Sequence, residues 1–198
     1  RGAAIASLGR RERARLLAVV EQLPEAPPSM TVGELASLGR FPHLGLLRQP
    51  SAHDYTIVEE ALERTGCRSL ADRAIGTLSG GERRRAFIAR ALAQEASLLL
   101  LDEPSANLDA EAQATLFDLL RDLASEGAGI LIVVHDLTSA AASCDRLVLL
   151  HQGQVLASGK PREVVTPEHV LAAYGPHVVV LPHPVTGTPI VIPAAAGR

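Results

Sequence analysis

Two neighbouring carboxylates, Asp102 and Glu103, follow a run of leucines at residues 98–101, and Pro104 comes directly after them. A short, continuously apolar run of this kind indicates a parallel strand that is covered on both faces. Open α/β sheets carry their chemistry at the carboxyl ends of their strands. There, one carboxylate can hold Mg²⁺ while the other polarises a water molecule. The alternative is a strand end that is merely acidic and solvated.

A glycine-rich step, Ser79-Gly80-Gly81, lies upstream of this strand and leads into a helix expected over residues 82–92. Two glycines let the backbone approach a ligand closely and adopt positive φ. The N-terminus of a helix presents unpaired N–H groups and the positive end of its dipole to an anion. The alternative is an ordinary serine cap followed by glycines. Together, the two segments predict a site that binds a nucleotide phosphate and activates a water molecule beside it.

These segments resemble motifs of the ATP-binding subunits of ABC transporters. Residues 78–82 resemble the family's signature motif, and residues 98–103 resemble its Walker B strand. Residues 105–109 resemble the D-loop, His135 the switch histidine and Gln22 the Q-loop glutamine. The motifs stand in the family's order and cover essentially the whole chain.

The resemblance implies a role for each residue around one ATP molecule. Asp102 is expected to help hold Mg²⁺, and Glu103 to act as the general base that orients the attacking water. His135 is expected to contact the γ-phosphate. Gln22 is expected to sense the Mg²⁺ and the water and to link them to a permease. Phosphoryl transfer depends mainly on positioning and charge neutralisation, which suits such a set of residues.

The resemblance also implies partners. Ser79, Gly80 and Gly81 are expected to close over ATP held by an opposing subunit, and Asp109 to communicate across that dimer. A second ATP-binding subunit, which we expect to be a second copy of this chain, would therefore complete each site. Permease subunits would bind the pair at the cytoplasmic face of the plasma membrane, and a substrate-binding protein would act through them.

One motif of the family is missing from the sequence. A P-loop reads G-x-x-x-x-G-K-[ST], and no such string occurs. The nearest match, residues 153–161, has one residue too many between its glycines and a proline, Pro161, where the Mg²⁺-binding hydroxyl belongs. We interpret it as a hairpin followed by a helix start. The chain opens on Arg1 and has a single methionine, Met30, so we expect that an N-terminal piece carrying the P-loop is absent.

Composition restricts the class of protein further. The chain has 198 residues, of which 47% are hydrophobic, enough for a sizeable core. No secretory signal is expected, and no apolar run in the sequence approaches the roughly 18 residues of a membrane helix. A net charge of −3 argues against nucleic acid as a partner. Cys67 and Cys144 are expected to be reduced thiols, and the arginines at 10–11 and 83–85 to lie on solvated helix faces.

The predicted fold class is α/β, with a P-loop NTPase-type (RecA-like) parallel sheet core, truncated at its N-terminus, and a helical lobe. We divide the chain into residues 1–22, a remnant of the core with the Q-loop; 23–95, the helical lobe with the signature motif; and 96–198, the rest of the core with a C-terminal tail. Helices are expected over residues 10–16, 31–38, 51–65, 82–92, 110–125 and 164–173, and strands over 17–21, 97–101, 129–134, 146–150, 154–157, 178–181 and 189–192.

The expected type of ABC transporter rests on two further segments. Residues 31–35 with 39–43, and the tail at 183–189, resemble importers of iron chelates, haem and cobalamin. The alternative is that Gly39 and Pro42 merely end a helix and that His43 lies on the surface. The other candidate functions are another ABC importer or exporter, a DNA-repair or chromosome-structuring ATPase, a translation factor with tandem ATPase domains, and a non-catalytic interaction subunit. The absence of a long insertion between Gln22 and residue 78 argues against the repair ATPases, and the presence of both Glu103 and His135 argues against a non-catalytic subunit.

Overall fold

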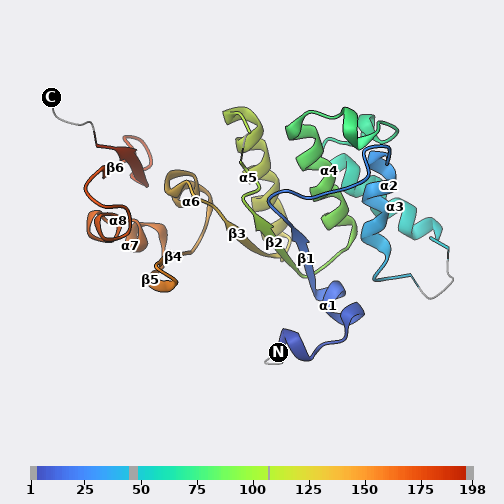
Figure 1. The fold of residues 1–198 in the computed structure, drawn as a ribbon, viewed down its shortest axis with the longest axis horizontal. Coiled ribbons are helices and arrows are strands. Elements are labelled where there is room, and N and C mark those ends of the chain that lie inside the picture. Colours follow the sequence, from blue (N-terminus) through green and yellow to red (C-terminus); the bar gives the residue numbers. More distant parts are fainter. Residues whose placement is uncertain (1–3, 45–48, 107, 195–198) are drawn as a thin grey trace. The chain divides into compact units, whose positions relative to one another are not determined.

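The computed structural model describes residues 4–44, 49–106 and 108–194. The chain divides into two compact units, Arg1–Val133 and Val134–Arg198. The first unit contains a parallel sheet and a group of helices, and the second contains two short hairpins with three helices (Figure 1).

The sheet of the first unit has three parallel strands in the order β1-β2-β3. These strands are β1 (Leu17–Val20), β2 (Leu98–Asp102) and β3 (Gly129–Val133). The register pairs Val20 with Leu101 and Asp102 with Val133, so the carboxyl ends of all three strands meet at one edge. The predicted α/β class with a parallel sheet is confirmed.

Burial alternates along the strands. Ala18, Val20, Leu99 and Leu101 are all 5% exposed or less and face the core. On the other face, Leu131 of β3 is 54% exposed. The expectation that the leucine strand is covered on both faces is therefore wrong for the described part of the chain: Leu99 and Leu101 are buried, whereas Leu98 and Leu100 are only half-buried.

The first unit contains five α-helices and four 3₁₀ turns among its described residues. They are α1 (Arg10–Leu16), α2 (Val32–Ser37), α3 (Ala52–Arg64), α4 (Gly80–Ala93) and α5 (Ala110–Ser125), with 3₁₀ turns at Ile5–Ser7, Leu38–Arg40, Arg68–Leu70 and Ile75–Thr77. Helix α4 packs against α2 and α3 and also against β1. Its fully buried Phe87 and Ile88 join Val20 and Leu101 of the sheet and Leu116 of α5 in one core.

Three helices of this unit begin with the same local structure, a capping box. Thr31, Ser51 and Ser79 each cap a helix, and the acidic residue three positions later returns a hydrogen bond to the cap's backbone. This reciprocal pattern satisfies two backbone N–H groups that the helix leaves unpaired. It explains why the helix starts expected at residues 31 and 51 are found, with Thr31 and Ser51 as the caps.

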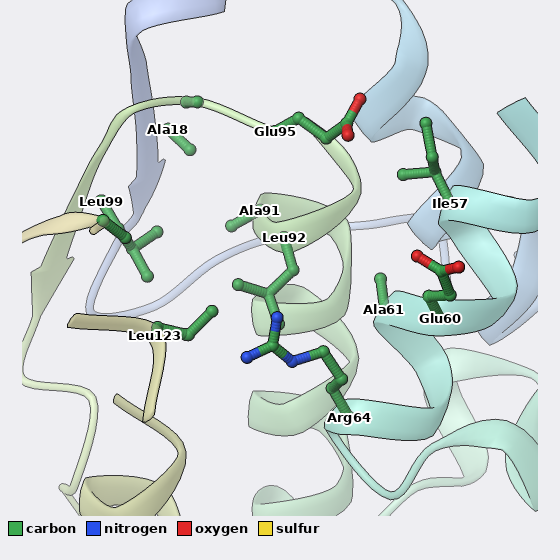
Figure 2. Close-up of a pocket in the computed structure, with 12 residues that line it drawn as sticks. Ala18, Ile57, Glu60, Ala61, Arg64, Ala91, Leu92, Glu95, Leu99 and Leu123 are labelled. Carbon is green, nitrogen blue, oxygen red and sulfur yellow. The ribbon is translucent and has the colours of Figure 1, made fainter. Parts of the chain in front are cut away.

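A cavity of about 210 Å³ lies where the helices meet the sheet. Ala18 and Leu99 approach it from β1 and β2, Ala91 and Leu92 from α4, and Ile57 from α3 (Figure 2). Arg64 lies at its border and pairs with Glu126, beyond the end of α5, through two hydrogen bonds of 2.9 and 2.8 Å. The cavity thus lies at the junction of α3, α4 and the sheet.

The second unit is smaller. Its elements are α6 (Leu137–Ser143), β4 (Leu147–His151), β5 (Gln154–Gly159), α7 (Pro161–Val164), α8 (Pro167–Tyr174), β6 (Val178–Pro182) and β7 (Pro189–Pro193). Gly153 has a φ of 77° and turns the first hairpin, and Pro161 begins α7, as expected. The helix expected over 164–173 is instead divided between α7 and α8, because Thr166 caps a new helix that starts at Pro167.

Candidate functional site

The expected catalytic pair meets at the carboxyl edge of the parallel sheet. Gln22 follows β1 by two residues, and Glu103 follows β2 directly. The Nε2 of Gln22 donates a hydrogen bond to Oε2 of Glu103 over 2.8 Å. Because β1 and β2 are adjacent and parallel, residues 81 positions apart in sequence come within hydrogen-bonding distance.

Glu103 has an unusual backbone conformation. Its φ is 46°, in the left-handed region that a residue with a side chain rarely adopts. Its N–H donates to the carbonyl of Val133 at 2.9 Å, and its own carbonyl accepts from the N–H of Ala106 at 3.1 Å. Strained backbone of this kind persists where the surroundings fix it, and it is often found at functional sites.

A guanidinium on the helix that begins at the signature residues also holds this turn. Arg84 of α4 donates from Nη2 to the carbonyl of Glu103 and from Nη1 to the carbonyl of Glu21, each over 2.9 Å. Arg84 is only 9% exposed. Burial lowers the pKa of this guanidinium, and the charges of Glu103 and Asp102 act in the opposite direction.

The expectation that the arginines at 83–85 lie on a solvated helix face is therefore wrong for Arg84. Consecutive helical residues point in different directions, and position 84 shares its face with Ile88 and Ala91, at i+4 and i+7. Both of these are buried. That spacing was visible in the sequence and could have identified Arg84 as an inward-facing cation.

The signature residues lie at the N-terminus of α4. Ser79 accepts a hydrogen bond from the N–H of Glu82 at 3.2 Å, and the carboxylate of Glu82 accepts from the N–H of Ser79 at 2.7 Å. These hydrogen bonds lower the pKa of Glu82. The helix begins at Gly80 rather than at residue 82, and neither Gly80 nor Gly81 has positive φ.

The two glycines are not needed for an unusual backbone conformation. They keep the start of α4 free of side chains. A Cβ at Gly80 would meet nothing within 4 Å, and Gly80 is exposed. A Cβ at Gly81 would lie 3.5 Å from the side chain of Leu108. The start of α4 therefore presents a backbone without side chains to solvent, which is what an approaching anion requires.

Asp109 caps α5, its Oδ1 accepting from the N–H of Ala112 at 2.8 Å. Asp109 and Gly81 line the same cavity, of about 520 Å³, between the beginnings of α5 and α4. The structure thus brings the D-loop and signature residues together. Asn107, within the expected D-loop, lies outside the described residues.

His135 belongs to the second unit, between β3 and α6, and its side chain is exposed. Its role rests on the resemblance alone. Asp102, at the end of β2, is half-buried. No group of three or more His, Cys, Asp or Glu residues in the described ranges forms a metal site. Mg²⁺ typically takes one or two carboxylates together with substrate phosphates and waters, and the oxygen donors of Asp102 and Gln22 fit that need.

The segment at 39–43 is anchored to the end of α4 instead of merely ending a helix. Gly39 lies so close to α4 that a Cβ there would be 2.2 Å from the carbonyl oxygen of Arg90. The ring Nε2 of His43 lies 2.8 Å from the carbonyl oxygen of Gln94. His43 is half-buried and lies within hydrogen-bonding distance of α4's end rather than standing free on the surface.

Arg40, 4% exposed, bridges three parts of the helical lobe. Its Nε donates to Asp54 at 2.9 Å, and its Nη1 donates to the carbonyl of Ala93 at 2.8 Å and to Glu95 at 2.7 Å. Hydrogen bonds from the side chain and backbone of Ser51, followed by that from Arg40, hold the pKa of Asp54 far below its usual value. This network fixes the segment at 39–43 to α3 and α4.

The fold is the α/β fold of the P-loop NTPase class, with the expected carboxylates at the edge of the sheet and the glycine step on a separate helix. The family model described as "ABC transporter" matches residues 1–106. This chain belongs to the ABC transporter family.

Two curated relatives and one solved structure show how far the similarity extends. The "Probable siderophore transport system ATP-binding protein YusV" of Bacillus subtilis is 41% identical over 198 residues, covering 100% of this chain and 72% of that protein. The "Ferric enterobactin transport ATP-binding protein FepC" of Escherichia coli is 40% identical, covering 92% and 68%. The solved structure titled "An inward-facing conformation of a putative metal-chelate type ABC transporter" aligns with a TM-score of 0.81 at 28% identity, covering 90% of this chain and 72% of that chain. No helix in the described part of the chain is long and apolar enough to cross a membrane.

Proposed function

We propose that this chain is the ATP-binding subunit of an ABC importer that couples ATP hydrolysis to the uptake of an iron–siderophore, haem or cobalamin. The hydrogen bond between Gln22 and Glu103, at 2.8 Å, carries the catalytic part of this proposal, because it joins the expected permease-linked residue to the expected general base. The names of YusV and FepC support an iron–siderophore cargo.

In the proposed reaction, Glu103 accepts a proton from the water that attacks the γ-phosphate of ATP. Asp102 and Gln22 offer oxygen ligands to Mg²⁺, whose chemical contribution is to neutralise charge on the phosphates. His135 contacts the γ-phosphate. Ser79, Gly80 and Gly81 close over ATP held by a second copy of this chain, and Asp109 relays the state of one site to the other.

The proposed division of the chain follows these roles: residues 1–22 and 96–198 form the ATPase core, and residues 23–95 form the lobe that carries the signature helix. The permease would dock on the cytoplasmic side of the plasma membrane. Because the printed sequence contains no P-loop string, we expect no ATP turnover by the chain as printed, since it lacks the backbone cradle and the lysine that such a loop supplies.

The test compares phosphate release, with Mg²⁺ and ATP, by the chain as printed and by a version extended at its N-terminus with a P-loop segment of the family, here called the extended chain. We expect turnover by the extended chain and none by the printed one. Robust turnover by the printed chain would contradict the motif assignment. An extended chain that binds ATP without hydrolysing it would contradict the assignment of the catalytic residues.

The import part of the proposal needs a test in cells. Deletion of the gene should abolish uptake of one labelled cargo, a ferric siderophore, haem or cobalamin, and the native gene should restore it. A gene carrying Glu103→Gln should not restore uptake. Unchanged uptake of all three cargoes in the deletion strain would contradict the proposed substrate class while leaving the ATPase assignment intact.

A further inference from the structure

Arg84 bonds to the backbone of Glu103 and to the backbone of the residue that precedes Gln22. It donates to the carbonyl of Glu103 and to the carbonyl of Glu21, the residue directly before Gln22, at 2.9 Å each. The Gln22 side chain donates to the carboxylate of Glu103 at 2.8 Å. One guanidinium therefore holds the carbonyl of Glu103 and the carbonyl that directly precedes Gln22.

The planar fork of arginine suits this arrangement. A guanidinium presents several N–H donors in fixed directions, whereas a lysine ammonium is a point charge on a flexible stem. Both contacts are to uncharged carbonyl oxygens, and the side chain is 9% exposed. The two hydrogen bonds of this buried charge go to the backbone of the site, and the charges of Glu103 and Asp102 act to keep the guanidinium protonated.

The contact with Glu103 acts where the backbone is strained. A φ of 46° at Glu103 requires surroundings that fix it. The carbonyl of Glu103 accepts from Arg84 and from the N–H of Ala106, and its N–H donates to Val133. Loss of the Arg84 contact removes one of the hydrogen bonds that hold this conformation.

Arg84 also joins the site to the signature step. It lies on α4, five residues after the cap Ser79, and lines the same cavity of about 520 Å³ as Gly81 and Asp109. A displacement of the start of α4 would therefore be transmitted, through a rigid helix and one side chain, to the backbones of Glu21 and Glu103.

We propose that Arg84 is a positioning residue that holds Gln22 and Glu103 in their catalytic geometry and couples that geometry to the signature helix. This inference rests on the proposed function for its catalytic meaning, although the positioning itself can be measured without ATP.

The first measurement is amide hydrogen exchange on the chain without nucleotide. Arg84→Met keeps an apolar side chain of similar length but removes both hydrogen bonds. We expect the amides of Glu103 and Ala106 to exchange about tenfold faster or more, since a hydrogen bond from a charged group is lost. Arg84→Lys should give a smaller increase, because one ammonium can serve only part of the fork.

Arg90→Met is the matched control. Arg90 is on the same helix, is half-buried, stacks 5.2 Å from the ring centre of Phe87 and has its Nη2 3.5 Å from the carbonyl oxygen of Val19. Its loss should lower thermal stability without changing exchange at Glu103 and Ala106. Equal exchange at these amides in Arg84→Met and Arg90→Met would overturn the proposal. If Arg84→Met does not fold, the comparison of Arg84→Lys with Arg90→Lys decides in the same way.

The second measurement compares the effect of each variant on ATP affinity with its effect on kcat in the extended chain. Arg84→Met should lower kcat by about tenfold or more while ATP affinity stays within about twofold, as expected when positioning alone is lost. Parent-like kcat in Arg84→Met would overturn the catalytic meaning of the inference. An inactive parent would instead count against the proposed function, and the exchange data would still decide the positioning role.

Discussion

Gln22 Nε2 donates to Glu103 Oε2 over 2.8 Å, across the carboxyl ends of two adjacent parallel strands. The donor end of the amide faces the carboxylate, which leaves the amide oxygen of Gln22 outside this hydrogen bond and suited to a cation. The pair thereby joins the residue expected to respond to a permease with the residue expected to activate water. Movement of the Q-loop would change the position of Glu103 directly.

In the extended chain, Glu103→Gln should abolish ATP turnover while ATP binding stays near the parental level. Glutamine keeps the size and the hydrogen-bonding reach of glutamate but lacks the negative charge that polarises water. The measurement pairs phosphate release with nucleotide affinity by fluorescence titration. Turnover near the parental rate would show that another group is the base.

Asp54→Asn should destabilise the chain by about 2–3 kcal/mol, less than the roughly 3–5 kcal/mol seen when a buried charge loses its only partner. The reason is that Arg40 retains Glu95, at 2.7 Å, after its bond to Asp54 is weakened. The check is urea unfolding of both proteins at pH 7.

The same pair predicts a pH dependence. Hydrogen bonds from Ser51, followed by Arg40, depress the pKa of Asp54 in the folded chain, whereas the unfolded value is about 3.9. A depressed folded pKa contributes stability above the unfolded pKa, and this contribution is lost as the pH falls from about 4 toward the folded pKa. The stability difference between the parent and Asp54→Asn should therefore shrink below about pH 4. A constant difference from pH 6 to pH 2 would contradict the assignment.

Gly39→Ala should destabilise the helical lobe by about 3 kcal/mol, at the upper end of overpacking costs. Its Cβ would lie 2.2 Å from the carbonyl oxygen of Arg90, and a backbone atom within a helix cannot rotate away. Gly33→Ala is the matched control, because its nearest atom would be 3.4 Å away and alanine favours the helix. Equal thermal stability of the two variants would show that the lobe shifts freely at Gly39.

Local signals in the sequence predicted the helices and strands, but they predicted the contacts between these elements less well. Helix α5 was predicted at its observed bounds, Ala110–Ser125, because that segment is amphipathic. The Arg40–Asp54–Glu95 network was not predicted, because its members come from separate segments that meet only after α3 and α4 pack. For the same reason, Arg84 was assigned to solvent, although its helical spacing from Ile88 pointed inward.

The candidate site was predicted as a set of residues but not as a geometry. The order of the motifs gave Gln22 and Glu103, and the parallel register of β1 and β2 explains why they meet. The left-handed φ of Glu103 had no sequence signal, since glutamate seldom adopts it. The sequence left two possible roles for Ser79, a helix cap and a ligand contact. The structure shows that it does cap α4.

The cap at Ser79 leaves its second expected role, in the dimer, open to a direct test. Ser79→Ala removes only the cap and should cost about 0.5–2 kcal/mol of stability. Ser79→Arg removes the cap and also places a bulky cation at the exposed start of α4, where the partner's γ-phosphate is expected. In the extended chain with Glu103→Gln, both variants should therefore bind ATP as monomers, and Ser79→Arg should block ATP-driven dimerisation, as measured by light scattering. Ser79→Ala should still dimerise. If both variants lose stability equally and both dimerise with ATP, Ser79 is a helix cap and the space above it does not receive the nucleotide.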